Sequence, residues 1–315
     1  MVRRLLTRRS AAPPLVQTRR VRTAPTGPRV TLEPYRPGPL EAVRSAWRDR
    51  HVVPWLSLRV VAKGFAGTRL GRGWLLLRPA FELAGMGVLF GAVFNAPSPG
   101  LPYFLFLIAG MTCWRFFQLA TLFGARSVQY YRRHASALHF GTLLVPIGAS
   151  SIALVDLAIH GGILAGTIAW FALTDQNYLH FGPQLLLAPV ALVLMLLLAW
   201  ALAFWLSIVV AHVLDVRVLL RYVLQLWMLV TPVIYPLSFM SDTLEKLALA
   251  NPVTPFVELF RWSLFDTGSV PMTSFAAALG VTAVLLVGGI WFHTRAFPRA
   301  LLAMMNAVGD DEDDY

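Results

Sequence analysis

The chain has 315 residues, of which 57% are hydrophobic and only 14% are charged, and its mean hydropathy is +0.62. A soluble domain of this length rarely reaches such an apolar fraction, so the composition excludes an ordinary soluble domain and indicates an integral membrane protein. The formal net charge is +11, but 17 of the 27 Lys and Arg residues precede residue 79. This clustering favours a basic segment beside a membrane over a nucleic-acid-binding face.

The first part of the chain, residues 1–54, is rich in Arg and Pro and lacks an apolar core long enough for a signal peptide. It is therefore predicted to be a disordered basic cytosolic arm. Residues 55–74 alternate apolar side chains with Arg59, Lys63 and Arg69 at near-helical spacing. This segment is too polar to cross a bilayer, and it predicts either an amphipathic helix in the cytoplasmic interface or a plain basic anchor.

Six segments have the length of about 20 mostly apolar residues that a membrane-spanning helix needs. They are residues 75–95, 102–124, 145–172, 184–211, 218–237 and 273–293. The connections after the first and third segments contain no Lys or Arg, whereas those after the second and fourth contain three and two. Arg295 and Arg299 follow the sixth segment. By the positive-inside rule, both termini are predicted to be cytoplasmic.

The fifth span is interrupted by two prolines, Pro232 and Pro236, in the stretch LVTPVIYP. Residues 238–266, which follow, are moderately amphipathic and are broken again at Asn251 and Pro252. Irregular backbone at membrane depth is tolerated only where protein or a water-filled cavity satisfies it. The pattern therefore predicts a pair of re-entrant half-helices before the last span.

Some ionisable side chains fall within the predicted spans, where they cost several kcal/mol unless they are paired or hydrated. A spacing of four residues puts Arg78 and Glu82 on one helix face, and Asp156 and His160 on another, so each pair is predicted to interact. Arg115 has no local partner of this kind.

Five stretches occur in this order along the chain: LGRGWLLLRP (70–79), PYFLFLIAGMTCWRFF (102–117), DVRVLL (215–220), TPVIYP (231–236) and NPVTPFVELFRW (251–262). Together they resemble the permeases of the type-2 ABC transporter superfamily, and among them the polysaccharide and polyol-phosphate exporters, which include the O-antigen, teichoic acid and capsule permeases. The resemblance implies an all-α integral membrane protein with six transmembrane helices, an N-terminal amphipathic interfacial helix, and re-entrant half-helices before the last span. The transmembrane domain would cover residues 75–295, and residues 296–315 would form a cytosolic acidic tail.

The resemblance also implies a function. The chain would be the permease subunit of an ATP-driven exporter that moves a lipid-linked polysaccharide, or a related cell-envelope glycan, across the bacterial plasma (inner) membrane. It would act as a homodimer with two copies of a nucleotide-binding ATPase subunit. The chain has no G-x-x-x-x-G-K-[ST] loop, so ATP and Mg would bind the partner. No catalytic residue, cofactor or metal is expected in this chain.

Two other functions stay open at this point. A type-2 ABC drug or antibiotic efflux permease would have the same layout. A membrane-embedded glycosyltransferase or acyltransferase would need carboxylates or histidines clustered at one membrane face, whereas the loops predicted to lie outside offer Asp175 and His180. A structural subunit that transports nothing is disfavoured by the broken helix, because such backbone usually lines a transport path.

Two groups of residues are predicted to carry the implied function. Contacts to the ATPase are assigned to cytosolic turns and to the interfacial helix, namely Asp215, Val216, Arg217, Tyr131, Arg132, Arg133, Arg59, Lys63 and Arg69. The translocation path and its gate are assigned to Trp227, Pro232, Tyr235, Pro236, Asn251, Pro252, Glu258, Arg261 and Arg115. The alternative for the basic residues is a purely topological role, and for the aromatic residues a lipid-facing belt.

Overall fold

The computed structural model describes residues 16–20, 30–34, 38–57, 73–96, 98, 100–131, 141–174, 178–213 and 215–312. Most of the predicted interfacial helix, residues 55–74, lies outside this part of the chain. The residues of the predicted ATPase contact that also lie outside it are Arg59, Lys63, Arg69, Arg132 and Arg133.

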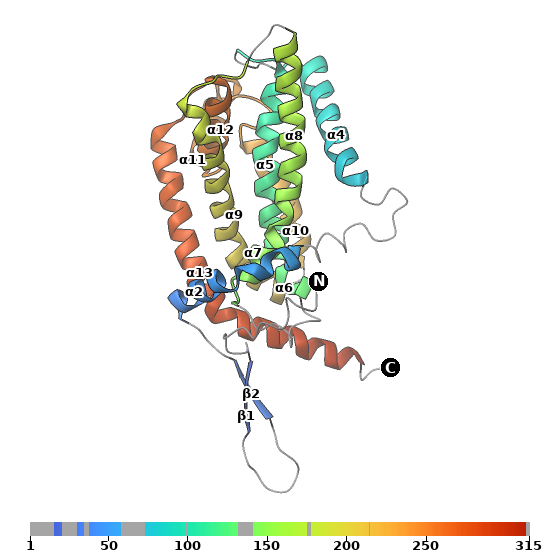
Figure 1. Cartoon of the computed structure of the whole chain (residues 1–315), viewed down its shortest axis with the longest axis vertical. Coiled ribbons are helices and arrows are strands. Elements are labelled where there is room, and N and C mark those ends of the chain that lie inside the picture. Colours follow the sequence, from blue (N-terminus) through green and yellow to red (C-terminus); the bar gives the residue numbers. More distant parts are fainter. Residues whose placement is uncertain are drawn as a thin grey trace.

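Helices of 7 to 41 residues pack into a bundle (Figure 1). They are α4 (Trp74–Met86), α5 (Tyr103–Ala125), α7 (Leu144–Ser150), α8 (Ile152–Leu173), α9 (Leu187–His212), α10 (Asp215–Val230), α11 (Asp242–Ala250), α12 (Thr254–Phe265) and α13 (Met272–Glu312). A π-helical segment, Gly87–Val93, continues α4, and 3-10 turns occur at Arg50–Val52, Pro183–Leu186 and Leu237–Phe239. Two short helices, α2 (Pro39–Arg48) and α6 (Ser127–Tyr131), lie at one end of the bundle (Figure 1).

Within the described residues, four helical segments are long and apolar enough to cross a membrane. They are Tyr103–Ala125, Leu144–Leu173, Pro183–His212 and Met272–Ala300, and they coincide with the second, third, fourth and sixth predicted spans. The other two predicted spans correspond to shorter helices. The first is α4 with its π-helical extension, and the fifth is α10, which has 16 residues and carries Arg217 and Arg221.

Helix α5 forms the centre of the bundle and is buried along most of its length. It packs against α7, α8, α9 and α12. Small residues allow these close approaches, because a Cβ added at Gly124 would lie 2.6 Å from the Cβ of Ala203 on α9. The residues around α5 form the main hydrophobic core.

Helices α9 and α13 pack closely through one tryptophan. Trp205 Nε1 donates a hydrogen bond to the Leu285 carbonyl oxygen over 3.0 Å, and its ring stacks on Phe292 with 4.7 Å between centroids. A Cβ at Gly289 would lie 3.0 Å from Trp205 Nε1 and 3.1 Å from the Ala201 carbonyl oxygen. Glycine at this position therefore allows the two helix backbones to approach each other.

Residues 1–54 are predicted to be disordered, and this prediction is wrong for residues 39–48, which form α2. Proline at its start and Arg48 in its last turn favour the helix. Tertiary contact stabilises it, because Ala42 is buried in a cluster with Leu143 and Phe204. Gly141 allows this contact, since a Cβ there would lie 2.9 Å from the Ala46 backbone nitrogen.

The all-α prediction holds for the helical bundle, but the described residues also include one β-hairpin. Its strands, β1 (Val16–Arg20) and β2 (Val30–Pro34), pair antiparallel with Val16 opposite Pro34. At the other end of the chain, residues 296–312 continue α13 through Pro298 rather than beginning a separate tail. The sequence LLAMM that follows this proline consists of strong helix formers.

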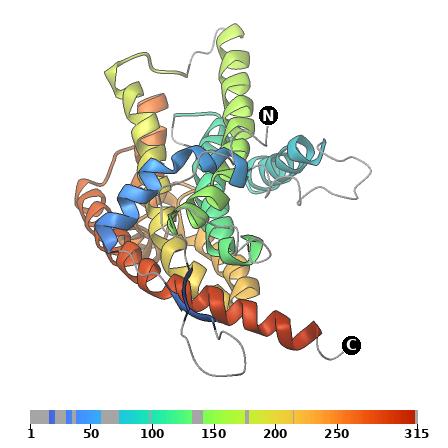
Figure 2. The ribbon, with the colours of Figure 1, turned by 60° about the horizontal axis from the view of Figure 1, so that its bottom comes forward.

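The two ends of the bundle differ in charge. Helix α6, the start of α10 and the C-terminal part of α13 lie at the same end, and α2 lies across it (Figures 1 and 2). Basic residues gather at this end, because Arg126 directly precedes α6, Arg217 is in the first turn of α10, and Arg295 and Arg299 are in the C-terminal part of α13. Helices α11 and α12 lie toward the opposite end (Figure 1).

Replacing Gly289 by Leu should lower the apparent thermal midpoint of the protein in detergent. The new side chain would collide with Trp205 and the α9 backbone, and overpacking of this kind costs about 1–3 kcal/mol. Gly280→Leu is the matched control, because it lies on the same helix and a Cβ there would meet nothing within 4 Å. Size-exclusion chromatography after heating measures both midpoints. Equal midpoints for the two variants would contradict the close packing of α9 and α13.

Candidate functional site

Helix α10 ends at Val230, directly before the TPVIYP stretch, so the predicted break of this helix at its prolines is confirmed. Pro232 lacks the N–H that would continue the helix, and the chain forms a buried turn over residues 231–234. The Thr231 hydroxyl donates to the Trp227 carbonyl oxygen over 2.9 Å, and the Val233 N–H donates to the Thr231 carbonyl oxygen over 2.7 Å. Local bonds therefore close the end of α10.

Asn251, between α11 and α12, binds this turn and the end of α10 with the two ends of its amide. Its Nδ2 donates to Thr231 Oγ1 over 2.8 Å. Its Oδ1 accepts from Trp227 Nε1 and from the Val253 N–H, each over 3.0 Å. Both of those groups are donors only, which fixes the orientation of the amide. Pro252 favours the extended backbone of Asn251 that aims the side chain at the turn.

Arg261 of α12 holds the same turn from a second side, and it is 2% exposed. Its Nη1 donates to Glu258 Oε1 over 3.0 Å, and its Nη2 donates to the Val233 carbonyl oxygen over 2.9 Å. The guanidinium carbon lies 3.7 Å from the centre of the Phe106 ring on α5. Gly110 makes room for it, because a Cβ there would collide with Arg261 Nη2.

We call the residues that hold the turn the α10–α12 lock. It comprises Trp227, Thr231, Val233, Asn251, Glu258 and Arg261. Pro232 and Pro236 are buried beside it. Tyr103 of α5 adds a hydrogen bond to the Ile234 carbonyl oxygen over 2.9 Å, and Tyr235 donates to the Leu229 carbonyl oxygen.

Several members of the lock are predicted from the sequence as residues of the translocation path, but the residues that they contact are not. Three of these contacts, Tyr103, Phe106 and Gly110, lie in the apolar second span, where an aromatic residue or a glycine is indistinguishable from ordinary packing residues. Thr231 stands inside the TPVIYP stretch, yet nothing local identifies Asn251 as its partner. These partners are 20 or more residues away in sequence.

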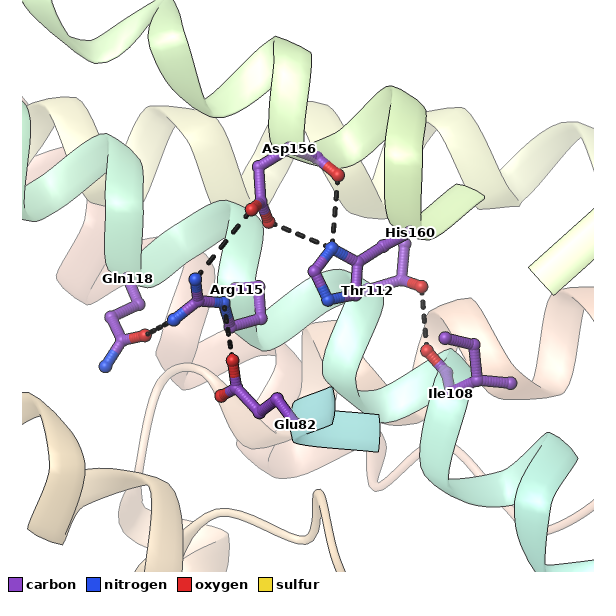
Figure 3. A network of polar contacts seen from close by, with 7 residues as sticks. All are labelled: Glu82, Ile108, Thr112, Arg115, Gln118, Asp156 and His160. Atoms are coloured by element: carbon purple, nitrogen blue, oxygen red, sulfur yellow. Dashed lines mark hydrogen bonds and ion pairs between the residues drawn. The ribbon is translucent and has the colours of Figure 1, made fainter. Parts of the chain in front are cut away.

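A second polar group lies between α4, α5 and α8, around Arg115, whose side chain is 6% exposed (Figure 3). Arg115 Nε is 3.8 Å from Glu82 Oε2, and Arg115 Nη2 is 3.8 Å from Asp156 Oδ1. Its Nη1 donates to Gln118 Oε1 over 3.0 Å. The predicted pairing of Glu82 with Arg78 is therefore wrong. Glu82 lies on the side of α4 that faces α5, whereas Arg78 is exposed.

The predicted pairing of Asp156 with His160 is confirmed, with 3.0 Å between His160 Nδ1 and Asp156 Oδ2. His160 is fully buried, and its Nε2 has no hydrogen-bond partner among the described residues. The same holds for Arg115 Nε. Buried polar atoms in proteins are usually hydrogen-bonded, so these two nitrogens leave bonding capacity for water or for the hydroxyl groups of a ligand. We call Glu82, Arg115, Asp156 and His160 the buried charge cluster.

The third region is the basic end of the bundle. Asp215 and Arg217 are exposed in the first turn of α10, and Val216 is half-buried beside them. Arg126 Nη2 donates to the Arg217 carbonyl oxygen over 3.0 Å, which connects the α6 region to the start of α10. Burial lowers the pKa of the Arg126 guanidinium from its usual value, with Tyr130 opposing this shift. Tyr131 ends α6, close in sequence to this contact.

Replacing Arg115 by Leu should destabilise the protein strongly, because it leaves the half-buried carboxylates of Glu82 and Asp156 without this cation. Removing one partner of a buried ion pair costs about 3–5 kcal/mol. Arg78→Leu is the control, because it removes an exposed charge from α4 and should change the thermal midpoint little.

Adding Glu82→Gln and Asp156→Asn to Arg115→Leu should restore part of the lost stability, because no unpaired carboxylate then remains. Heating followed by size-exclusion chromatography compares all of these variants. Similar losses for Arg78→Leu and Arg115→Leu would contradict the cluster and would support the Arg78–Glu82 pair instead.

Comparison with known proteins agrees with this architecture. The family model described as ABC-2 type transporter matches residues 60–265, more than half of the chain. The chain is also similar to a protein of Myxococcus xanthus described as O-antigen export system permease protein RfbA. The two are 24% identical over 260 residues, which cover 82% of this chain and 95% of that protein. The match to the family model includes the α10–α12 lock and the buried charge cluster, and this multi-pass membrane protein belongs to the ABC-2 type transporter family.

Proposed function

We propose that this chain is the permease subunit of an ATP-driven exporter that moves a lipid-linked polysaccharide, or a related cell-envelope glycan, across the bacterial plasma membrane. The observation that carries the proposal is the interrupted α10 with its lock, in a chain of the ABC-2 type family. The O-antigen permease, which aligns with 82% of the chain, supports a glycan as the substrate.

The proposed topology has six spans. In it, α4 with its π-helical extension and α10 join the four longer apolar segments. Helices α11 and α12 form the re-entrant pair before the last span, α13. The basic residues at one end of the bundle support a cytosolic location for this end, and hence for both termini.

The proposed assembly is a homodimer with two copies of a separate ATPase subunit, which would bind ATP and Mg. One side of α10 supports the homodimer, because Leu219, Tyr222 and Leu226 are 58–65% exposed on a helix that would face a second copy across the path. Asp215, Val216 and Arg217 are proposed to contact the ATPase, with Tyr131, Arg132 and Arg133, and with Arg59, Lys63 and Arg69, as further contacts.

In this assembly the lock would couple ATP hydrolysis to movement of the translocation path. A push on the exposed start of α10 would move a helix whose other end is bonded to α12 through Thr231 and Asn251. The turn at Pro232 and Pro236 would then move with α12 as one body, which is the kind of rigid displacement that switches interfaces. Trp227 and Tyr235 are proposed to face sugar rings during passage, and Arg115 to bind glycan hydroxyl groups or the diphosphate linker.

The function is tested by purifying the tagged chain from its host in mild detergent. A soluble subunit with a nucleotide-binding phosphate loop should co-purify, and lipid-linked glycan should stimulate its ATP hydrolysis. The double variant Asp215→Lys with Arg217→Glu should lose the subunit, because both charges at the contact are reversed. Asp242→Lys with Lys246→Glu, the same charge reversals on exposed α11 at the other end, should keep it.

Either of two results would count against this assignment. Retention of the ATPase by the Asp215 and Arg217 double variant would remove the docking site from α10. Stimulation by amphipathic drugs, with no response to lipid-linked glycan, would replace glycan export by drug efflux.

Replacing Thr231 by Val should impair export while the ATPase subunit still co-purifies. The change keeps the shape of the side chain but leaves Asn251 Nδ2 buried without its acceptor, at a cost of about 1–3 kcal/mol. Thr231→Ser keeps the hydroxyl group and should export normally. Surface glycan of a host that depends on the variant is the measurement. Normal export from Thr231→Val would mean that transport does not need the lock.

A further inference from the structure

A groove opens between the C-terminal end of α9 and α13, at the basic end of the bundle. Its volume is about 410 Å³. Ile208, Val209 and Val213 line it from the α9 side, and Phe292 and Ala296 line it from α13. Its walls are therefore apolar, and the small side chain of Ala296 leaves the space between them open.

The groove forms where α9 and α13 are no longer packed against each other. Further into the bundle, Trp205 of α9 stacks on Phe292 and the helices are in close contact. Helix α9 then ends at His212, whereas α13 continues past Pro298. The lower part of α13 is left without an opposing helix from α9.

Two polar side chains complete the lining, His212 at the end of α9 and Arg299 on α13. Both are exposed at this end of the molecule. His212 Nδ1 donates to the Ile208 carbonyl oxygen over 2.8 Å, so it bonds within its own helix and Nε2 is left as a hydrogen-bond acceptor. An apolar groove with the Arg299 guanidinium at its mouth is complementary to an anion that carries a hydrocarbon chain.

The face of α13 beside the groove is suited to contact with lipid acyl chains. Val284, Val287 and Trp291 are 73%, 68% and 46% exposed along this membrane-crossing helix. Arg295 lies over the Trp291 ring, 4.4 Å from its centre, in the arrangement expected where a span leaves the hydrocarbon region. The groove therefore lies where acyl chains meet phosphate groups.

We propose that this groove binds an anionic phospholipid of the cytosolic leaflet, with an acyl chain along the apolar walls and the phosphate at Arg299. The apolar walls favour a phospholipid over free phosphate, and the Arg299 charge favours an anionic over a zwitterionic headgroup. The choice of leaflet follows the orientation proposed above, but the binding does not depend on the transported substrate.

Native mass spectrometry of the full-length protein, titrated with phosphatidylglycerol or phosphatidylethanolamine, tests the proposal. The wild type should bind phosphatidylglycerol more tightly. Arg299→Gln should weaken this binding about fivefold, as expected for one interfacial cation. Arg295→Gln is the matched control. It removes an equal charge one helical turn from Arg299, at a residue that does not line the groove, so this variant should bind phosphatidylglycerol like the wild type.

A second variant tests the contribution of the apolar space separately from that of the polar side chains. Ala296→Phe fills the space but keeps Arg299 and His212, so it should also weaken phosphatidylglycerol binding. Equal affinity of the wild type for the two lipids would overturn the proposal without reference to any variant. Tight binding of water-soluble glycerol phosphate, or equal losses in Arg295→Gln and Arg299→Gln, would overturn it as well. None of these outcomes would alter the evidence for glycan export.

Discussion

The turn that ends α10 needs partners for its backbone groups, because residues 231–234 are buried from bulk solvent. Two side chains supply such partners: Arg261 of α12 bonds the Val233 carbonyl oxygen, and Tyr103 of α5 bonds the Ile234 carbonyl oxygen. Asn251, between α11 and α12, adds a bond to the Thr231 hydroxyl. The interruption is consequently a fixed part of the bundle, and it can move only together with the helices that hold it.

Both polar groups inside the bundle depend on α5. Its N-terminal half carries Phe106 and Gly110, which receive Arg261, and its middle carries Arg115, which collects Glu82 and Asp156. A buried helix can hold Arg115 because this charge finds its partners on the neighbouring helices α4 and α8. These ion pairs add little net stability when complete, but breaking one is costly, so they fix which faces of α4 and α8 turn toward α5.

In the proposed exporter, α10 connects two regions with different tasks. Its start is exposed, and the Arg217 carbonyl oxygen there accepts a hydrogen bond from Arg126, which lies directly before α6. Its end is bonded through Trp227 and Thr231 to Asn251, which lies between α11 and α12. In this proposal a displacement of the start would reach the other end, because the intrahelical hydrogen bonds hold the rise per residue of α10 constant.

The sequence by itself determined the four long apolar spans, the end of α10 at its prolines, and the pair Asp156–His160, because these depend on local composition and on helix geometry. Only the tertiary structure decided that Glu82 pairs with Arg115 rather than Arg78, that Asn251 bonds Thr231, and that α2 folds against Gly141. Each of these contacts joins segments far apart in the chain, so it depends on which helix faces meet, and no local pattern of residues encodes that choice.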